Sequence, residues 1–367
     1  MWVYCGTIVL LVACVNEPGP GGSDAARYVG DRAFRRTAMV ASLVNPLNDY
    51  SQLRLAHYSV AGGWDDLVEW NPPVTALGTD EVASALDLGA AGLVDDPVAL
   101  VALGEQAFNH YPVQLWSSAP PGLWSDTVHG EGGLVQVVLD RPYIAATCST
   151  CHATVKRGAL VPGLANPTLD LGWGPGRLDV TTSDGHEPVR IPDLRPVAWL
   201  TYLQADATVH QPDVIALAIR IETLIVTSHA EAIRPPREVA LALATYVWSL
   251  APAAPPVPDN DAERAGRDLF VASCVGCHAG NAFTGEPVPL AVVGTDPIVG
   301  QSRDRGTGTY RVPSLRGVTD RALLLHDASV HSLAELLDPA RTTPGHHFGS
   351  ELSVAERAAL VAYLVTL

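Results

Sequence analysis

Two short runs of the form C-x-x-C-H constrain this chain more than any other feature of its sequence. The first, Cys-Ser-Thr-Cys-His, covers residues 148–152, and the second, Cys-Val-Gly-Cys-His, covers residues 274–278. At this spacing two thiols add across the vinyl groups of one haem, and the adjacent histidine then lies under the iron. The sequence therefore predicts two covalently bound haem c groups, whose attaching and proximal residues are Cys148, Cys151, His152, Cys274, Cys277 and His278.

The four cysteines of these runs have an alternative use, because four thiolates are a common ligand set for structural zinc. A zinc site would not require a histidine directly after the second cysteine of each pair, yet both pairs have one. The histidines therefore favour haem over zinc. The other two cysteines, Cys5 and Cys14, lie at the extreme N-terminus and leave no pair for a disulfide in the mature chain.

The N-terminus is typical of an exported protein. Residues 2–15 are mostly apolar and lead into a Gly- and Pro-rich stretch, a segment that is too short to span a bilayer and is typical of a signal peptide. Leu11–Cys14 resembles a bacterial lipobox with Cys14 as the lipidated first residue, although no lysine or arginine precedes the apolar run. Because haem c is attached outside the bacterial cytoplasm, we expect a periplasmic protein with a lipid anchor at Cys14.

The charge of the chain restricts its partners. The formal net charge is −16 at pH 7, and the sequence contains nothing that resembles a basic patch. A surface of this kind argues against binding to nucleic acid. It favours a basic or neutral redox protein as the partner, because opposite charges promote encounter.

An internal repeat surrounds the two haem runs. Residues 190–197 (Arg-Ile-Pro-Asp-Leu-Arg-Pro-Val) match residues 311–318 (Arg-Val-Pro-Ser-Leu-Arg-Gly-Val). A repeat of this kind indicates two copies of one structural unit, and the last matched segments have the periodicity of amphipathic helices. The further matched segments are 104–108 with 266–270, 206–210 with 327–331, and 237–250 with 354–367.

These patterns predict a mainly α fold with two tandem cytochrome c-type haem domains, long loops and an N-terminal extension. The high numbers of proline and glycine, 29 and 32, agree with short helices joined by loops. The linker between the two haem domains is Pro-rich and semi-rigid. The expected segments are 1–22 (signal peptide and tether), 23–94 (extension), 95–250 (domain one), 251–259 (linker) and 260–367 (domain two).

Several motifs of domain two together resemble the bacterial dihaem cytochrome c peroxidase superfamily. They are residues 266–270, 274–278, 310–318 and 325–329. The resemblance covers domain two well and domain one weakly. It implies two helical cytochrome c domains that face each other across a pseudo-twofold axis, with haems close enough to exchange electrons. One departure is the motif Tyr-Phe-His-Asp-Gly of the superfamily, which here reads Leu-Leu-His-Asp-Ala from Leu324.

The distal iron ligands differ from those that the resemblance implies. The peroxidases of the superfamily ligate one haem with a methionine, but the only methionines here are Met1 and Met39, outside both haem domains. Histidine is the natural replacement, and the repeat pairs His229 with His346 shortly before the last helix of each domain. We therefore predict His229 as a metal ligand in domain one and His346 in domain two, both giving low-potential haems.

Other histidines remain candidates for the distal positions. His210 and His331 are also paired by the repeat, and His347 is the direct neighbour of His346. His326 matches the histidine of the superfamily motif, but the corresponding residue in domain one is Ala205. His210 and His331 lie at expected helix starts, where a polar residue is unremarkable, so these two compete less strongly. His326 is expected to have a structural role in domain two only, and His347 stays an alternative to His346.

Two arginines are candidates for binding the haem propionates. Arg195 and Arg316 are matched by the repeat, and each follows a Pro-x-Leu sequence. Arginine binds carboxylates through paired, charge-assisted hydrogen bonds, which suits propionates. The alternative is that both are ordinary surface arginines.

The sequence predicts a dihaem c-type cytochrome that carries electrons in the periplasm by one-electron Fe(III)/Fe(II) cycling. The alternative is a peroxidase-like dihaem oxidoreductase, which would need one haem with an open distal face and an acid–base group above it. Two histidine distal ligands would block both faces and argue against the enzyme. Whether the protein is an enzyme is left open by the sequence.

The two C-x-x-C-H runs give a first testable prediction. Protein produced in a host that attaches haem c should show two haem additions by mass spectrometry, because each run supplies both thiols for one haem. A single addition, or zinc in place of iron, would contradict the prediction.

Overall fold

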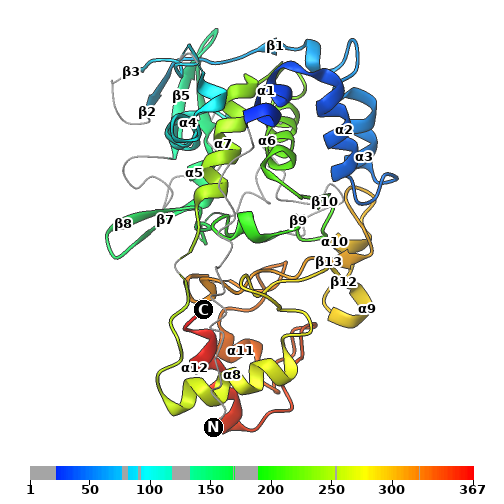
Figure 1. The fold of residues 1–367 in the computed structure, drawn as a ribbon, viewed down its shortest axis with the longest axis vertical. Helices are drawn as coiled ribbons and strands as arrows, with labels where there is room; N and C mark the ends of the chain where they lie inside the picture. Colours follow the sequence, from blue (N-terminus) through cyan, green and yellow to red (C-terminus); the bar gives the residue numbers. More distant parts are fainter. Residues whose placement is uncertain are drawn as a thin grey trace, which may run out of the picture.

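The computed structural model describes residues 22–76, 82–89, 92–117, 133–167, 169, 189–252, 254–321 and 323–367. The predicted signal peptide and Cys14 lie outside these ranges. In the described ranges the fold is mainly α, as predicted (Figure 1). None of the helices in these ranges has the length and apolar character needed to cross a membrane.

Helices dominate both haem domains and the extension. The α-helices are α1 (Gly22–Gly30), α2 (Arg32–Ser42), α3 (Asp49–His57), α4 (Pro97–His110), α5 (Cys148–His152), α6 (Val214–Ser228), α7 (Arg237–Ser249), α8 (Asp261–Ser273), α9 (Leu290–Val293), α10 (Ile298–Gln301), α11 (Leu333–Leu336) and α12 (Val354–Leu364). Short 3-10 helices are η1 (Trp64–Asp66), η2 (Leu93–Asp95), η3 (Val197–Trp199) and η4 (Val318–Asp320).

The strands are short and form small sheets. They are β1 (Val68–Glu69), β2 (Val74–Ala76), β3 (Val82–Ala83), β4 (Gln114–Trp116), β5 (Leu134–Val138), β6 (Pro142–Ala146), β7 (Ala153–Lys156), β8 (Ala159–Pro162), β9 (Tyr202–Leu203), β10 (Val209–His210), β11 (Ile233–Arg234), β12 (Val288–Pro289) and β13 (Thr309–Tyr310). One sheet has five strands in the order β3-β2-β5-β6-β4, all antiparallel, and the first haem run follows directly after its strand β6.

Capping residues set the starts of the main helices. Asp96 accepts hydrogen bonds from the first turn of α4, which begins with a proline, and Asn260 caps α8 in the same way. Ser353 begins α12 in a capping box with Glu356. These side chains satisfy backbone N–H groups that have no partner within the helix.

The same helix crossing occurs in both haem domains. In domain one α4 packs on α7, and in domain two α8 packs on α12. Gly104 lies against Ala242 in the first crossing, and Gly266 lies against Ala359 in the second. A Cβ atom on either glycine would collide with the carbonyl oxygen of the facing alanine, so glycine allows the backbones to approach. The repeat found in the sequence is thus a repeat of this crossing.

The extension shares one hydrophobic core with domain one. Helices α1, α2 and α3 pack beside α6 and α7 at one end of the molecule (Figure 1). Glu222 of α6 accepts hydrogen bonds at 2.8 Å from both Tyr28 and Tyr58 of the extension. Asp65 pairs with Arg35 at 2.8 Å and with Arg237 at 2.7 Å, so buried charges also join the extension to α7.

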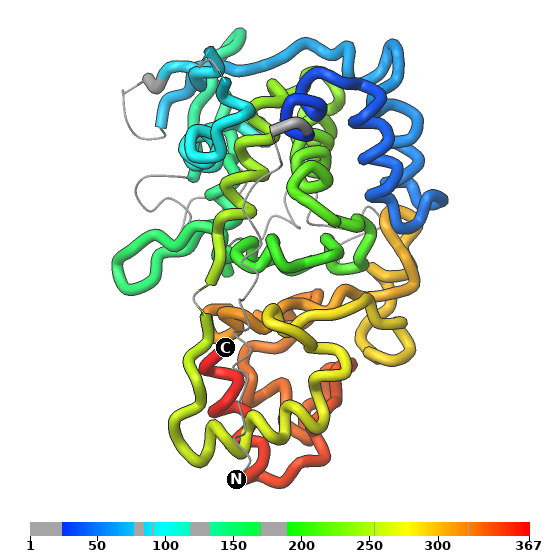
Figure 2. Tube along the Cα trace, viewed as in Figure 1, coloured from blue at the N-terminus to red at the C-terminus, as the bar shows by residue number. Residues whose placement is uncertain are grey.

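The extension also contacts domain two. The backbone N–H of Asp49 donates to the carbonyl of Arg303 at 3.0 Å, and that of Tyr50 donates to Asp304 at 2.8 Å. The side chain of Asn45 donates to the carbonyl of Gly306 at 2.8 Å. Figure 2 shows this meeting of the blue N-terminal trace with the orange segment of domain two. The extension therefore bridges the two haem domains.

The helix crossing in domain two gives a second prediction. Gly266→Ala should lower the free energy of unfolding of domain two by about 1–3 kcal/mol, because the added methyl group forces α8 and α12 apart. Gly30→Ala is the control, since a Cβ atom there meets nothing within 4 Å. Denaturant unfolding followed by circular dichroism measures both variants. Equal midpoints for the two would contradict the proposed role of Gly266.

Candidate haem-binding site

A cavity of about 470 Å³ lies between the two haem domains and is lined by both C-x-x-C-H runs. Domain one contributes residues of α5, and domain two contributes the turn that follows α8. Most of the other lining residues are apolar, among them Leu217 of α6 and Leu360 of α12. All four cysteines of the runs are free thiols, as haem attachment requires. The runs predicted from the sequence therefore meet at one site.

The proximal histidines have the hydrogen bonds that an iron ligand needs. His152 Nδ1 lies 3.0 Å from the carbonyl oxygen of Pro192, and His278 Nδ1 lies 3.0 Å from that of Phe283. A carbonyl oxygen can only accept, so each Nδ1 carries the hydrogen and each Nε2 keeps its lone pair for a metal. Burial lowers the pKa of His152 to about 4 and also lowers that of His278, which keeps both rings neutral at pH 7.

His346 faces His278 across the space where an iron would lie. The two ring centroids are 6.3 Å apart. Metal–imidazole bonds are about 2.0 Å long and each centroid lies about 1.1 Å behind its nitrogen, so an ion between two imidazoles separates the centroids by about 6.2 Å. The Nδ1 atom of His346 is buried and has no hydrogen-bond partner among the described residues. The distance and the unpaired nitrogen both fit an iron held between His278 and His346.

The loop that carries His346 holds the ring in place. Its backbone N–H donates to the carbonyl of Val293 at 2.8 Å, and Arg341 donates to the carbonyl of Gly345 at 2.7 Å. His346 itself adopts φ = 50°, a left-handed conformation that costs free energy in a non-glycine residue. The ring of Phe348 lies 5.3 Å away and covers the histidine on one side.

The structure does not bring His229, the predicted ligand of domain one, to the cavity. It caps the C-terminus of α6, its Nε2 lies 3.2 Å from the carbonyl of Pro112, and its ring packs 4.9 Å from Trp70. The reason is the length of the helix. Helix α6 has 15 residues, whereas α11, the corresponding helix of domain two, has 4. The longer helix ends away from the cavity, so His229 and His346 have different surroundings despite the repeat.

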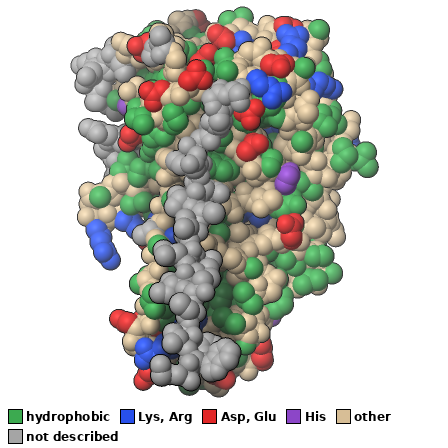
Figure 3. Space-filling model, viewed as in Figure 1, with side chains coloured by type: hydrophobic (Ala, Val, Ile, Leu, Met, Phe, Trp, Pro, Cys, Tyr) green, Lys and Arg blue, Asp and Glu red, His purple; other side chains and the backbone are tan. Residues whose placement is uncertain are grey.

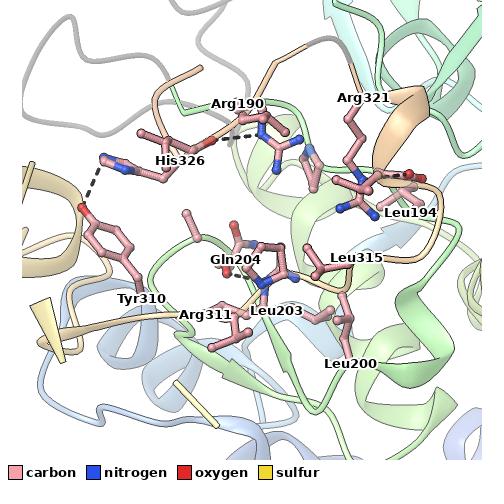
Figure 4. A pocket seen from close by; sticks show the side chains of 18 of the residues that line it. Arg190, Leu194, Leu200, Leu203, Gln204, Tyr310, Arg311, Leu315, Arg321 and His326 are labelled. Atoms are coloured by element: carbon pink, nitrogen blue, oxygen red, sulfur yellow. Dashed lines mark hydrogen bonds and ion pairs between the residues drawn. The ribbon is translucent and has the colours of Figure 1, made fainter. Parts of the chain in front are cut away.

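The other candidate histidines fall into two groups. His210, His331 and His347 do not line the cavity: His210 packs against Tyr202, and the other two are exposed. His326 does line it, and its ring stacks on Tyr310 with centroids 4.5 Å apart (Figure 4). His326 is thus a cavity residue of domain two without a histidine counterpart in domain one.

The two arginines predicted to bind propionates have other contacts. Arg195 pairs with Asp193 and Asp320, both at 2.7 Å. Arg316 lies over the ring of Trp199 at 4.7 Å and donates to backbone carbonyls. Neither arginine lines the cavity. Both instead join domain one to domain two, because each has a partner in the other domain.

Other arginines take the positions in the cavity. Arg190, Arg311, Arg321 and Arg220 line it, and the first three converge on it in Figure 4. Burial and the charges of neighbouring arginines lower the pKa of Arg190 to about 9 and that of Arg311 to about 10, so both stay cationic at pH 7. Carboxylates such as haem propionates fit these cations. The sequence held the signal for this pair, because the repeat aligns Arg190 with Arg311 at the start of the same matched segments that contain Arg195 and Arg316.

The two arginines cross the domain interface reciprocally. Arg190 donates from its backbone N–H to His326 at 2.7 Å and from Nε to the carbonyl of Leu325 at 3.1 Å. Arg311 donates in the same way to Ala205 at 2.9 Å and to Gln204 at 3.1 Å. The receiving turns also match, since Gln204 and Leu325 have φ of 69° and 62°. This reciprocity supports the pseudo-twofold relation implied by the resemblance.

Comparison with known families identifies one part of the chain. Residues 263–367 match the family model of cytochrome c. This segment contains the second haem run, the glycine crossing of α8 and α12, and His346. The match supports covalently bound haem c in domain two and a haem-based redox function. No curated protein matches the chain.

Three solved structures are similar to the chain at low identity. They are hydrazine synthase of Kuenenia stuttgartiensis pressurised with xenon (15% identity, 73% of this chain and 87% of that chain, TM-score 0.45), a MauG-like protein associated with microbial copper homeostasis (18%, 61% and 83%, 0.39), and the dihaem peroxidase BthA of Burkholderia thailandensis (18%, 82% and 94%, 0.40).

The position of His346 gives a third prediction. His346→Ala should convert the haem attached at Cys274 and Cys277 from low spin to high spin, because it removes the strong-field nitrogen opposite His278. Electron paramagnetic resonance of the ferric protein measures the change. His347→Ala is the matched control, since its exposed ring does not line the cavity. A spectrum unchanged in His346→Ala, or changed equally in His347→Ala, would move the ligand elsewhere.

Proposed function

We propose that the protein is a dihaem c-type cytochrome that transfers electrons through two haems held between its domains. The observation that carries the proposal is the 6.3 Å spacing of His278 and His346, which suits a six-coordinate iron. Two histidine nitrogens hold iron in one coordination geometry in both oxidation states, as a fast electron carrier requires. The lining of the cavity by both runs supports an electron path from one domain to the other.

Each part of the cavity has a role in this proposal. One-electron Fe(III)/Fe(II) cycling is the chemistry that haem supplies when it is bound. Cys148, Cys151, Cys274 and Cys277 attach the two groups. His152 and His278 provide Nε2, and the carbonyls of Pro192 and Phe283 fix the orientation of these rings. The apolar lining excludes water and tunes the reduction potential through the local polarity.

The N-terminal segment, the haem c attachment runs and the net charge support a proposal for the location and the partner of the protein. We infer an exported protein of the bacterial periplasm, anchored by lipid at Cys14, because haem c is assembled there. Figure 3 shows acidic side chains spread over the visible face among fewer basic ones, in line with the net charge of −16. A basic or neutral redox protein is therefore the expected partner, and its approach would weaken with added salt.

A second candidate function rests on a different observation. Among the described residues of domain one that line the cavity, His152 is the only histidine. The cavity face of α6 presents apolar side chains, including Ile221 and Leu224, toward the same space. A haem without a distal protein ligand would bind small molecules, so this asymmetry favours a peroxidase-like dihaem oxidoreductase of the superfamily that the sequence resembles.

One experiment tests the proposal against this alternative, and is our fourth prediction. We expect the ferric protein to show a low-spin haem with two histidine ligands in domain two, and hydrogen peroxide to oxidise no added electron donor. The readouts are the spin states of both haems and the peroxide-dependent rate of donor oxidation. A high-spin haem in domain one with rapid turnover of peroxide would replace the electron-transfer proposal by the enzyme. The absence of any low-spin bis-histidine centre would contradict the electron-transfer proposal.

A further inference from the structure

The interface between the haem domains buries more positive than negative charge. Among the described residues, four arginines line the cavity, whereas the only acidic residue that lines it is Asp193. Asp193 already accepts ion pairs from Arg195 at 2.7 Å and from Arg321 at 3.3 Å. Its carboxylate is thus already paired with two arginines, and positive charge remains elsewhere in the cavity.

Arg190 and Arg311 carry most of this excess. Each guanidinium group donates from Nε to a neutral backbone carbonyl and not to a carboxylate. The acid that acts electrostatically on Arg311 is Asp206, which is 1% exposed and whose pKa burial raises to about 7, so its negative charge is only partial at neutral pH. Arg190 and Arg311 also repel each other and Arg321.

Bringing like charges into an apolar interface opposes docking of the two domains. A buried charge without an opposite charge beside it is strongly unfavourable in a low-dielectric interior. Arg190 and Arg311 donate hydrogen bonds across the interface to backbone carbonyls. These acceptors carry no net charge, so they do not remove the repulsion between the arginines. A closed interface therefore needs anions from outside the protein chain, and the chemical group that fits the planar guanidinium fork is a carboxylate.

We propose that Arg190 and Arg311 form a carboxylate-binding pair that couples haem loading to docking of the two domains. The inference rests on the proposed function, because two haems bring the propionate carboxylates that neutralise the pair. The two domains then close on each other only after the haems are attached. Arg190 and Arg311 are positioning residues: they set the relation between the domains and touch no reacting atom.

The fifth prediction concerns the haem-loaded, full-length protein. The double variant Arg190→Gln and Arg311→Gln should open the interface, whereas Arg190→Lys and Arg311→Lys should keep it closed, because lysine retains the positive charge. Hydrogen exchange of the turns at 204–206 and 325–327, measured by mass spectrometry, reports the opening. We expect exchange about tenfold faster for glutamine and within about twofold of the unmodified protein for lysine.

A matched control separates a local effect from a change in total charge. Arg264→Gln with Arg267→Gln removes two positive charges from the surface of α8, where both residues form exposed ion pairs. This control should leave exchange at both turns unchanged. If the lysine variants are as open as the glutamine variants, then the hydrogen bonds from arginine Nε to the backbone carbonyls matter and the positive charge does not. That result would overturn the proposal. Glutamine variants that behave like the control would do the same.

In a chain without haem, the glutamine substitutions should have the opposite effect on the interface. Replacing the four attachment cysteines by serine removes the carboxylates but keeps the arginines, so small-angle scattering should show a larger radius of gyration. Adding Arg190→Gln and Arg311→Gln to that chain should bring the radius back toward the loaded value, because the repulsion is gone. If Arg190 and Arg311 had a purely structural role, the glutamine substitutions would open the interface both in the haem-loaded protein and in the haem-free chain. If the haem-free chain does not fold, the comparison of glutamine with lysine decides.

Failure of the proposed function is distinguishable from failure of this inference. Mass spectrometry of each loaded variant counts its haems before the exchange measurement. A protein without two haems would contradict the proposed function itself. Two haems together with an interface that ignores the arginine substitutions would contradict only the coupling.

Discussion

Two arginines that cross the domain interface in opposite directions organise this molecule. Arg190 binds the turn at Leu325 and His326, and Arg311 binds the turn at Gln204 and Ala205, with nearly equal distances on the two sides. These bonds place both C-x-x-C-H runs on one cavity. Because a strained turn receives each arginine, the interface forms only when both domains present the correct backbone conformation. The relative position of the two haem sites depends on this exchange of contacts.

The repeated architecture supports two sites that are not equal. Domain two presents His346 opposite His278, within the distance that an iron between two imidazoles needs. Domain one uses a helix of 15 residues where domain two has 4, and its His229 ends beside Pro112 and Trp70. The different helix lengths thus give the two C-x-x-C-H runs different surroundings. Under the proposed function, two haems with different ligands would differ in reduction potential, which would give electron flow a direction.

Charge at the interface links the cofactor to the arrangement of the domains. The ion pairs of Arg195 and Arg321 with Asp193 are complete within the protein, and the pair between Arg321 and Asp193 crosses the interface. Arg190 and Arg311 lack a carboxylate of this kind and face the cavity. The extension adds a third connection through the backbone of Asp49 and Tyr50. The interface is therefore partly built by the chain and partly completed by the groups that the cavity holds.

The sequence by itself determined the local chemistry of this protein. The two C-x-x-C-H runs predict the attachment and proximal residues, because thiol spacing and the adjacent histidine are properties of consecutive residues. The repeat also predicted the paired helices, and the structure places Gly104 and Gly266 at equivalent crossings. The mainly α fold followed from the same patterns. These features needed no knowledge of long-range contacts.

Only the tertiary structure decided which matched residues reach the cavity. The repeat aligned His229 with His346 and Arg195 with Arg316 equally well, but alignment does not report which way a side chain points. His229 lies at the end of the long helix α6, away from the cavity. Arg195 lies in the interface, where it forms an ion pair with Asp320. Arg190 and Arg311, at the other end of the same matched segments, turned toward the cavity instead. The physical reason is that packing across two domains sets these directions, and packing depends on residues far apart in the chain.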